Sequence, residues 1–248
     1  MLEPYVNQAA GLQLMAPQAA TRLVGVTSHG QQQGEMPLLW GLCNAWVELG
    51  LSVLVLDGHT RESAHNPGLA QLLDNPQTRF DDDDEAAECW TVWPAAAGFE
   101  QLGQSGFSAS TLGALFPNYA VVLIYADAAT MTRLLKRSGL APLLVVSPLK
   151  SSTLSAYQAL KQLLLEAQLR PTVANIVLPI AAHANMPDTT HTHPLQHCAQ
   201  TFLGYAIRPL TITASASAER SRDGINRLAL ELLENAVLLE RHPAERMH

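Results

Sequence analysis

The stretch "VTSHGQQQGEMP", Val26 to Pro37, decides how this sequence is interpreted. It follows an apolar run with strand character and precedes a longer apolar run with helical character. In many proteins this place holds the phosphate-binding loop GxxxxGK[ST]. The first question is therefore whether the loop can still hold a phosphate.

Short apolar runs alternate with helical patterns along the whole chain. Each run is apolar on both faces, which is typical of parallel strands that helices cover on both sides. The expected strands are residues 21–28, 51–57, 119–126, 141–147 and 172–178, with a weaker sixth at 204–212. The expected helices are residues 36–49, 128–138, 151–168 and 192–203. The sequence predicts a single-domain, doubly wound α/β fold with a mainly parallel sheet.

Composition limits the function classes. The formal net charge of −7 opposes the counterion release that drives non-specific nucleic-acid binding. Cys43, Cys89 and Cys198 show no CxxC spacing, and no run approaches 18 uninterrupted apolar residues. We expect a cytoplasmic protein that does not have nucleic acid as its main partner. Charged residues are only 15% of the chain, which hints that partners cover part of its surface.

The loop departs from the phosphate-binding template where the template carries chemistry. With the second glycine placed on Gly34, His29 stands at the first glycine, Glu35 at the lysine and Met36 at the hydroxyl residue. The lysine supplies positive charge to the terminal phosphates, and the hydroxyl ligates Mg²⁺. A carboxylate about 4 Å from a phosphate charge repels it by roughly 4 kcal/mol at an effective dielectric constant near 20. We expect binding of ATP and Mg²⁺ to be lost or very weak, and we expect no cofactor.

The order of these segments resembles the MinD/ParA-like P-loop ATPases, and specifically their flagellar branch, known as FlhG, FleN or YlxH. The loop "SHGQQQGEMP" aligns without a gap with the group's "SGKGGVGKTT", which places Gly30 at its signature lysine. The segment "ELGLSVLVLDGH" looks like "ELGKRVLLLDAD" and retains Asp57, with His59 at the second aspartate. The segment "YAVVLIYADAA" matches "YDVVLIDTGAG" and puts Tyr125 at the Walker B aspartate. Further similar segments lie at residues 92–98, 143–164 and 202–204.

The matching segments lie in the scaffold of the fold, whereas the departures lie at the positions that bind nucleotide and Mg²⁺ in the family. The resemblance therefore implies a pseudo-ATPase, which keeps the fold of a nucleotide switch without its catalytic groups. Asp57 and Asp127 are candidate replacement metal ligands, although an acid at the end of a strand more often caps the next helix. The rival hypothesis is an active MinD/ParA-type ATPase with an unusual loop.

Residues 1–20 are a candidate partner-binding segment ahead of a MinD-like domain at 21–248. Members of the flagellar branch begin with "DQAxxLR", and this chain has "NQAAGLQ" shortly before its first strand. In that branch the segment engages the FlhF GTPase and stimulates its GTP hydrolysis. The positions that correspond are Asn7, Gln8, Ala9, Leu12 and Gln13. Replacement of the motif's Asp by Asn7 and of its Arg by Gln13 removes one charge of each sign, which weakens electrostatic contacts through this segment.

A C-terminal amphipathic helix is expected at residues 224–241. Its apolar face includes Ile225, Leu228, Leu232 and Leu233. MinD-like proteins often end with a membrane-targeting helix, which needs basic residues to meet anionic lipid. Because this segment is richer in glutamate, we favour packing on the core or on a partner, with weak membrane association as the alternative.

By resemblance, the process is control of flagellar number, placement or biosynthesis through protein contact. The candidate partners are an FlhF-like GTPase, a flagellar basal-body component and a MinD-like paralogue, at the inner membrane or the cell pole. A scaffold in another polar machine, such as cellulose secretion or pilus assembly, is the alternative. Four histidines (His183, His191, His193 and His197) lie within fifteen residues, but a polar surface loop explains them better than a metal site does.

Overall fold

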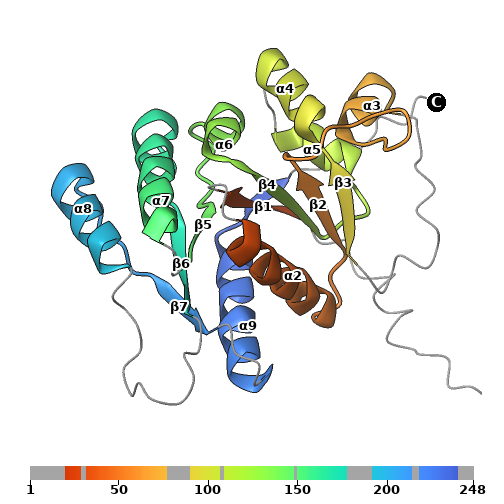
Figure 1. Cartoon of the computed structure of the whole chain (residues 1–248). Coiled ribbons are helices and arrows are strands. Elements are labelled where there is room, and N and C mark those ends of the chain that lie inside the picture. The colour runs from red at the N-terminus through yellow and green to blue at the C-terminus, as the bar shows by residue number, and fades with distance from the viewer. Residues whose placement is uncertain are drawn as a thin grey trace, which may run out of the picture.

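The computed structural model describes residues 20–28, 32–76, 90–106, 109–147, 150–177, 192–213 and 218–239. These residues form a sheet with helices on both of its faces (Figure 1). The strands are β1 (Thr21–Ser28), β2 (Val53–Asp57), β3 (Thr91–Pro94), β4 (Val121–Asp127), β5 (Leu143–Val146), β6 (Thr172–Val177), β7 (Leu210–Thr213) and β8 (Val237–Leu239). The helices are α2 (Gln32–Glu48), α3 (Leu69–Asp74), α4 (Ala96–Ser105), α5 (Ala109–Leu115), α6 (Ala128–Leu135), α7 (Lys150–Gln162), the π-helical turn η2 (Leu163–Ala167), α8 (His193–Leu203) and α9 (Ala218–Glu234).

The strand order is β3-β2-β4-β1-β5-β6-β7, and these pairs are all parallel. Strand β8 pairs antiparallel with the first half of β1. The predicted doubly wound α/β architecture with a mainly parallel sheet is therefore confirmed. All six expected strands are present, because runs that are apolar on both faces fit only a sheet covered on both sides.

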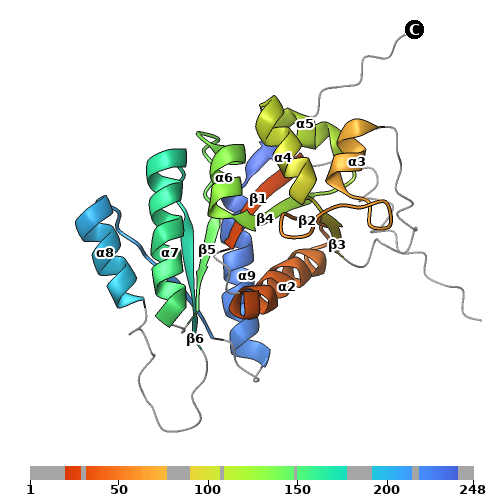
Figure 2. The ribbon, with the colours of Figure 1, turned by 45° about the horizontal axis from the view of Figure 1, so that its top comes forward.

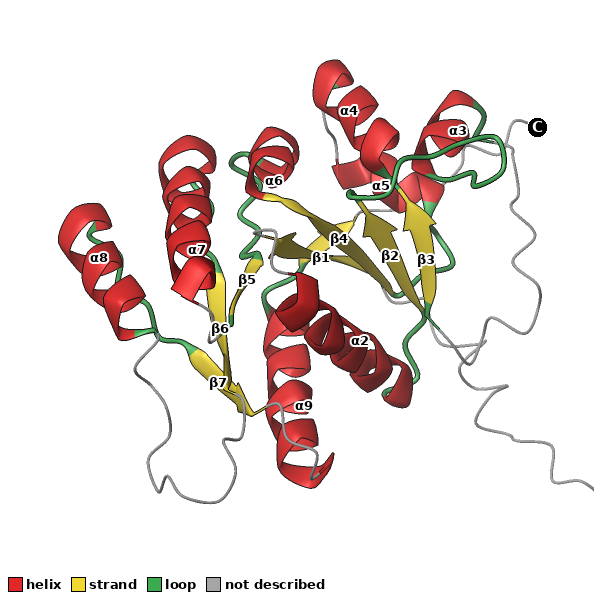
Figure 3. Cartoon of the chain, viewed as in Figure 1, coloured by secondary structure: helices red, strands yellow, loops and turns green. Residues whose placement is uncertain are grey.

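Helices α2 and α9 cover one face of the sheet, and α3 to α8 cover the other (Figures 1 and 2). The two helices of the first face are joined by a buried hydrogen bond, in which Trp46 Nε1 donates to the Ala229 carbonyl at 3.1 Å. Figure 3 shows the strands as a single layer between these helices. The core is thus two apolar layers that share the sheet.

The C-terminal helix has different bounds from those expected. It begins at Ala218 and ends at Glu234, and β8 follows it, so the expected helix at 224–241 was wrong in its limits. Residues 237–239 leave the helical pattern because Leu239 pairs with Thr21 and enters the core on the opposite face of the sheet. The side chains of Ile225, Leu228, Leu232 and Leu233 pack with α2, as favoured from the sequence. Among the described helices, none is long and apolar enough to cross a membrane.

Helix α2 begins earlier than expected, and several short elements were not expected at all. It starts at Gln32, four residues before the expected start at residue 36, and it contains Pro37. Packing of its apolar face on the sheet offsets the hydrogen bond that a proline removes from a helix interior. Elements β3, α3 and α5 have four to seven residues, which give too few repeats for a periodic signal.

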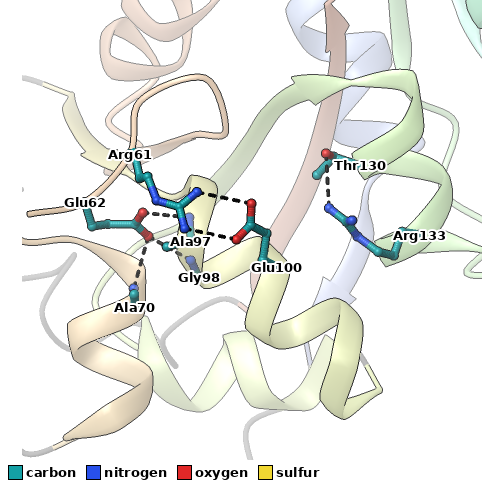
Figure 4. Close-up of polar contacts among 8 residues, drawn as sticks. All are labelled: Arg61, Glu62, Ala70, Ala97, Gly98, Glu100, Thr130 and Arg133. Atoms are coloured by element: carbon teal, nitrogen blue, oxygen red, sulfur yellow. Dashed lines mark hydrogen bonds and ion pairs between the residues drawn. The ribbon is translucent and has the colours of Figure 1, made fainter.

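Glu62 joins the loop after β2 to the first turns of two helices (Figure 4). Its carboxylate accepts from Ala97 N at 2.7 Å, Gly98 N at 2.9 Å and Ala70 N at 3.2 Å. These N–H groups lie at the starts of α4 and α3, where intrahelical acceptors are lacking and the dipole favours a negative charge. Gly68 permits the arrangement, since a Cβ there would collide with the Pro94 carbonyl oxygen. The Glu62 side chain thereby connects the first turns of α3 and α4.

We predict that Glu62→Ala lowers the free energy of unfolding by about 2 to 4 kcal/mol, because it removes an acceptor charge from three N–H groups. The matched control is Arg61→Ala, which removes an exposed ion pair with Glu100 at 3.2 Å and should cost less than about 1 kcal/mol. Urea unfolding followed by circular dichroism measures both. Equal losses in the two variants would contradict a structural role for Glu62.

Candidate functional site

The candidate site lies where the carboxyl ends of three strands meet the start of α2. Tyr125 of β4 is in register with Val26 of β1 and with Asp57 of β2, and Ser28 is in register with Asp127. Because side chains alternate between the faces of a strand, Ser28, Asp57 and Tyr125 are on the face that α2 covers. The sheet therefore delivers three polar side chains beneath the first turn of one helix.

The central contact joins the two residues that stand in place of the template's lysine and aspartate. The Tyr125 hydroxyl donates to Glu35 Oε2 at 2.8 Å and lies 3.4 Å from Ser28 Oγ. Glu35 and Tyr125 are each 2% exposed. Glu35 is in the first turn of α2, where the helix dipole favours a carboxylate. The helix start thus carries its own buried anion, held by a tyrosine from the middle of the sheet.

Burial raises the pKa of Tyr125 above its ordinary value. The hydrogen bond with Ser28 lowers this pKa by less than burial raises it, and the negative charges of Glu35 and Asp57 raise it further. Tyr125 is consequently a neutral hydroxyl near pH 7, able to donate a hydrogen bond to a carboxylate. A neutral phenol offers Mg²⁺ no charge, unlike the aspartate that the template has at this position.

The neighbouring acids, Asp57 and Asp127, accept hydrogen bonds from residues that follow them closely in the chain. Asp57 accepts from His59 N at 2.9 Å and from Thr60 Oγ1 at 2.6 Å. The His59 ring packs edge-on against Tyr125, with 4.9 Å between ring centroids. Asp127 caps α6 by accepting from Thr130 N at 2.7 Å. Asp127 therefore caps a helix, as acids at strand ends often do, whereas Asp57 holds the turn that follows β2.

Several predicted positions lie outside the described residues. These are His29 and Gly30 of the loop, the segment from Asn7 to Gln13, and His183 and His191. Gly34 is in α2, and Met36 packs partly buried against the core beneath that helix. His193 and His197 are exposed on α8. In the described part of the chain, no three His, Cys, Asp or Glu side chains are grouped closely enough to hold a metal ion.

No family model matches this chain, and no curated protein matches its sequence. Solved structures do match it. A ParA family ATPase from Chlorobium tepidum has a TM-score of 0.54 and 15% identity, over 85% of this chain and 98% of that one. A chain of the MinC:MinD cell division protein complex from Aquifex aeolicus has a TM-score of 0.55 and 14% identity, over 90% and 100%. A plasmid partition protein from Borrelia burgdorferi has a TM-score of 0.52 and 12% identity, over 86% and 99%.

The chain has the fold of the MinD and ParA ATPases. Identities of 12 to 15% establish the fold alone. Within this MinD-like fold, any activity must be argued from the side chains at the carboxyl edge of the sheet. Those side chains are the Glu35 and Tyr125 pair, Ser28, Asp57 and His59.

In the sequence, Glu35 and Tyr125 are two separate replacements, of the template's lysine and aspartate. Nothing in the sequence analysis predicted that the two side chains are partners. The signal lies in strand alternation, which places Tyr125 on the same face as Val26 and therefore toward α2. A phenol is long enough to reach across the sheet edge, whereas an aspartate would need a bridging ion or water. The pairing indicates that the two replacements are compatible with one another inside a folded core.

We predict that Tyr125 and Glu35 are energetically coupled. Tyr125→Phe should lower the free energy of unfolding by about 2 kcal/mol, because the buried carboxylate loses a hydrogen bond donor. Glu35→Gln should also destabilise, and the double variant should lose about 1 to 2 kcal/mol less than the sum. Urea unfolding of the four proteins gives this coupling energy.

The matched control for that cycle is Tyr205→Phe, which removes a hydrogen bond to the Pro171 carbonyl elsewhere in the fold. Its effect should add to that of Glu35→Gln within about 0.5 kcal/mol. Additive behaviour of Tyr125→Phe with Glu35→Gln would show that the contact contributes nothing to stability.

Proposed function

We propose that this chain is a non-catalytic, MinD-like regulator that acts by protein contact. The observation that carries the proposal is the buried hydrogen bond between Tyr125 and Glu35. In a phosphate-binding loop, the helix N-terminus and a lysine attract the phosphates. Here the first turn of α2 holds a carboxylate instead, and the strand that would supply an acid for Mg²⁺ supplies a neutral phenol.

A triphosphate at this helix start would meet a like charge in a buried setting. Moving Glu35 aside would break its hydrogen bond to Tyr125, although both side chains are buried. The residues present therefore do not fit Mg-ATP, and no catalytic step through a nucleotide follows from them. Hydrolysis by an unusual loop is the opposing hypothesis.

We predict that Mg-ATP at millimolar concentration leaves the melting temperature of the protein unchanged. A ligand at one hundred times its Kd would stabilise the fold by about 2.7 kcal/mol, which a thermal shift measurement detects readily. The double variant Glu35→Lys with Met36→Thr restores two template residues, and it should still show no ATP turnover because Tyr125 remains. A clear shift in the unaltered protein, or turnover in the variant, would favour an active ATPase.

We also propose a specific process for this contact function, which is flagellar placement or biosynthesis. It is supported by the "NQAAGLQ" segment, which resembles the "DQAxxLR" segment of the flagellar branch. The MinC:MinD complex from Aquifex aeolicus is an example of the same fold engaged with another protein. The proposed partners are an FlhF-like GTPase, a flagellar basal-body component or a MinD-like paralogue. A scaffold in cellulose secretion or pilus assembly would use the same kind of contact.

We predict that an FlhF-like GTPase from the same organism binds the full chain, and that Ala9→Glu with Leu12→Glu weakens binding at least tenfold. Each substitution places a charge at an apolar position that matches the motif. Gln18→Glu, outside the motif, is the matched control. Biolayer interferometry measures the affinities. Binding that is absent, or equal in all three proteins, would remove the support for an FlhF-type partner and leave the other machines to be tested.

A further inference from the structure

Charged residues are unevenly distributed along the chain. Residues 133–213 contain seven of the fifteen Lys and Arg residues but only two of the twenty-two Asp and Glu residues. Residues 133–213 are therefore a basic region of a protein whose formal net charge is −7. That region comprises the end of α6, helices α7 and α8, and strands β5 to β7.

Helices α6, α7 and α8 lie side by side over this part of the sheet (Figures 1 and 2). Their C-terminal ends are at the amino edge of the strands, because crossover helices run antiparallel to the strands they connect. Two hydrogen bonds link these ends. Arg137 N donates to the Ala167 carbonyl at 3.0 Å, and the Tyr205 hydroxyl donates to the Pro171 carbonyl at 3.0 Å. The surface at this edge is therefore built by three neighbouring helix ends, away from the Tyr125 and Glu35 pair.

This surface combines exposed apolar side chains with cations. Leu165 of η2 is 60% exposed, and Phe202 of α8 is 71% exposed. We call it the basic apolar surface, and its residues are Lys136, Arg137, Lys161, Leu165, Arg170 and Phe202. Its cations take part in no ion pair within the described residues, and Glu166 is the one acid on the same helical turn as Leu165. Large apolar residues beside unpaired cations are typical of an interaction site.

The backbone of the same surface carries two residues with positive φ and a π-helical turn. Arg137 and Gln168 both have a φ of 59°, and they are the only non-glycine residues with positive φ in the described part of the chain. Glycine would adopt this conformation more readily, yet both positions carry long polar side chains. Leu165 lies in the π-helical turn η2, a distortion that is frequent at functional sites. Both positive-φ residues stand where helices end, which is a common place for the left-handed conformation, so the π turn at Leu165 is the irregular feature of this surface.

We propose that the basic apolar surface binds an acidic amphipathic segment of a partner protein. Carboxylates of that segment would pair with Arg137, Lys136 and Arg170, while its apolar side chains would cover Leu165 and Phe202. A membrane is the less suitable occupant, because insertion needs a continuous apolar helix face, and here the apolar residues come singly from two helices. This inference goes beyond the proposed function, since it adds a second contact site that uses neither the N-terminal segment nor the nucleotide loop.

A random 16-residue peptide library, panned on the full-length protein, tests the proposal. We expect the enriched peptides to carry Asp or Glu beside large apolar residues, and to bind with affinities that fall at high salt. Arg137→Glu with Arg170→Glu should weaken the binding of these peptides at least tenfold, as should Phe202→Ser. Arg227→Glu, which reverses an exposed charge on α9, is the matched control and should change the affinity less than twofold.

Arg137→Gly separates a binding role from a structural one. Glycine relieves the positive φ, so the melting temperature should rise by a degree or two while peptide affinity falls severalfold. The proposal is overturned if no acidic peptides are enriched, if the enriched peptides bind the Arg137→Glu, Arg170→Glu variant normally, or if Arg137→Gly leaves affinity unchanged. Sedimentation with phosphatidylglycerol vesicles that these same variants abolish would assign the surface to a membrane instead, and would also overturn it.

Discussion

Burial of β1 on both faces is the constraint on which the rest of the structure depends. The strand pairs with β4 along its length, with β5 near its end and with β8 at its start. Its alternate side chains enter opposite core layers, so Leu23 belongs to one layer and Val24 and Val26 to the other. Because β1 is fixed in this way, the first turn of α2 is held at the centre of the carboxyl edge.

At that edge, a carboxylate occupies the helix position that attracts anions, and a phenol from β4 satisfies it. The contact is compatible with the fold because Glu35 and Tyr125 both point into the layer between α2 and the sheet. The fold that this chain shares with a ParA family ATPase does not by itself fix the chemistry at this edge. The hydrogen bond between Tyr125 and Glu35 is the basis of the proposal that the chain acts through contact with other proteins.

Two contact sites are proposed for this chain. One is the N-terminal segment that resembles a flagellar motif, and the other is the basic apolar surface formed by the ends of α6, α7 and α8. The second was not evident from the sequence, because Leu165 and Phe202 are separated by more than thirty residues and each fits an ordinary helical pattern. Only the packing of α6, α7 and α8 brings these helix ends, together with Arg137 and Arg170, to the same edge of the sheet.

The sequence by itself determined the class of fold, since the apolar runs at β1, β2, β4, β5 and β6 require burial on two faces. It also determined which chemical groups stand at the loop, because Glu35, Met36 and Tyr125 can be read directly. Only the tertiary structure decided that Glu35 and Tyr125 are partners, that residues 237–239 leave the helix to pair with β1, and that Glu62 orders two short helices. The physical reason is that each of these outcomes depends on a contact between distant segments, whereas periodicity and residue type report only local preference.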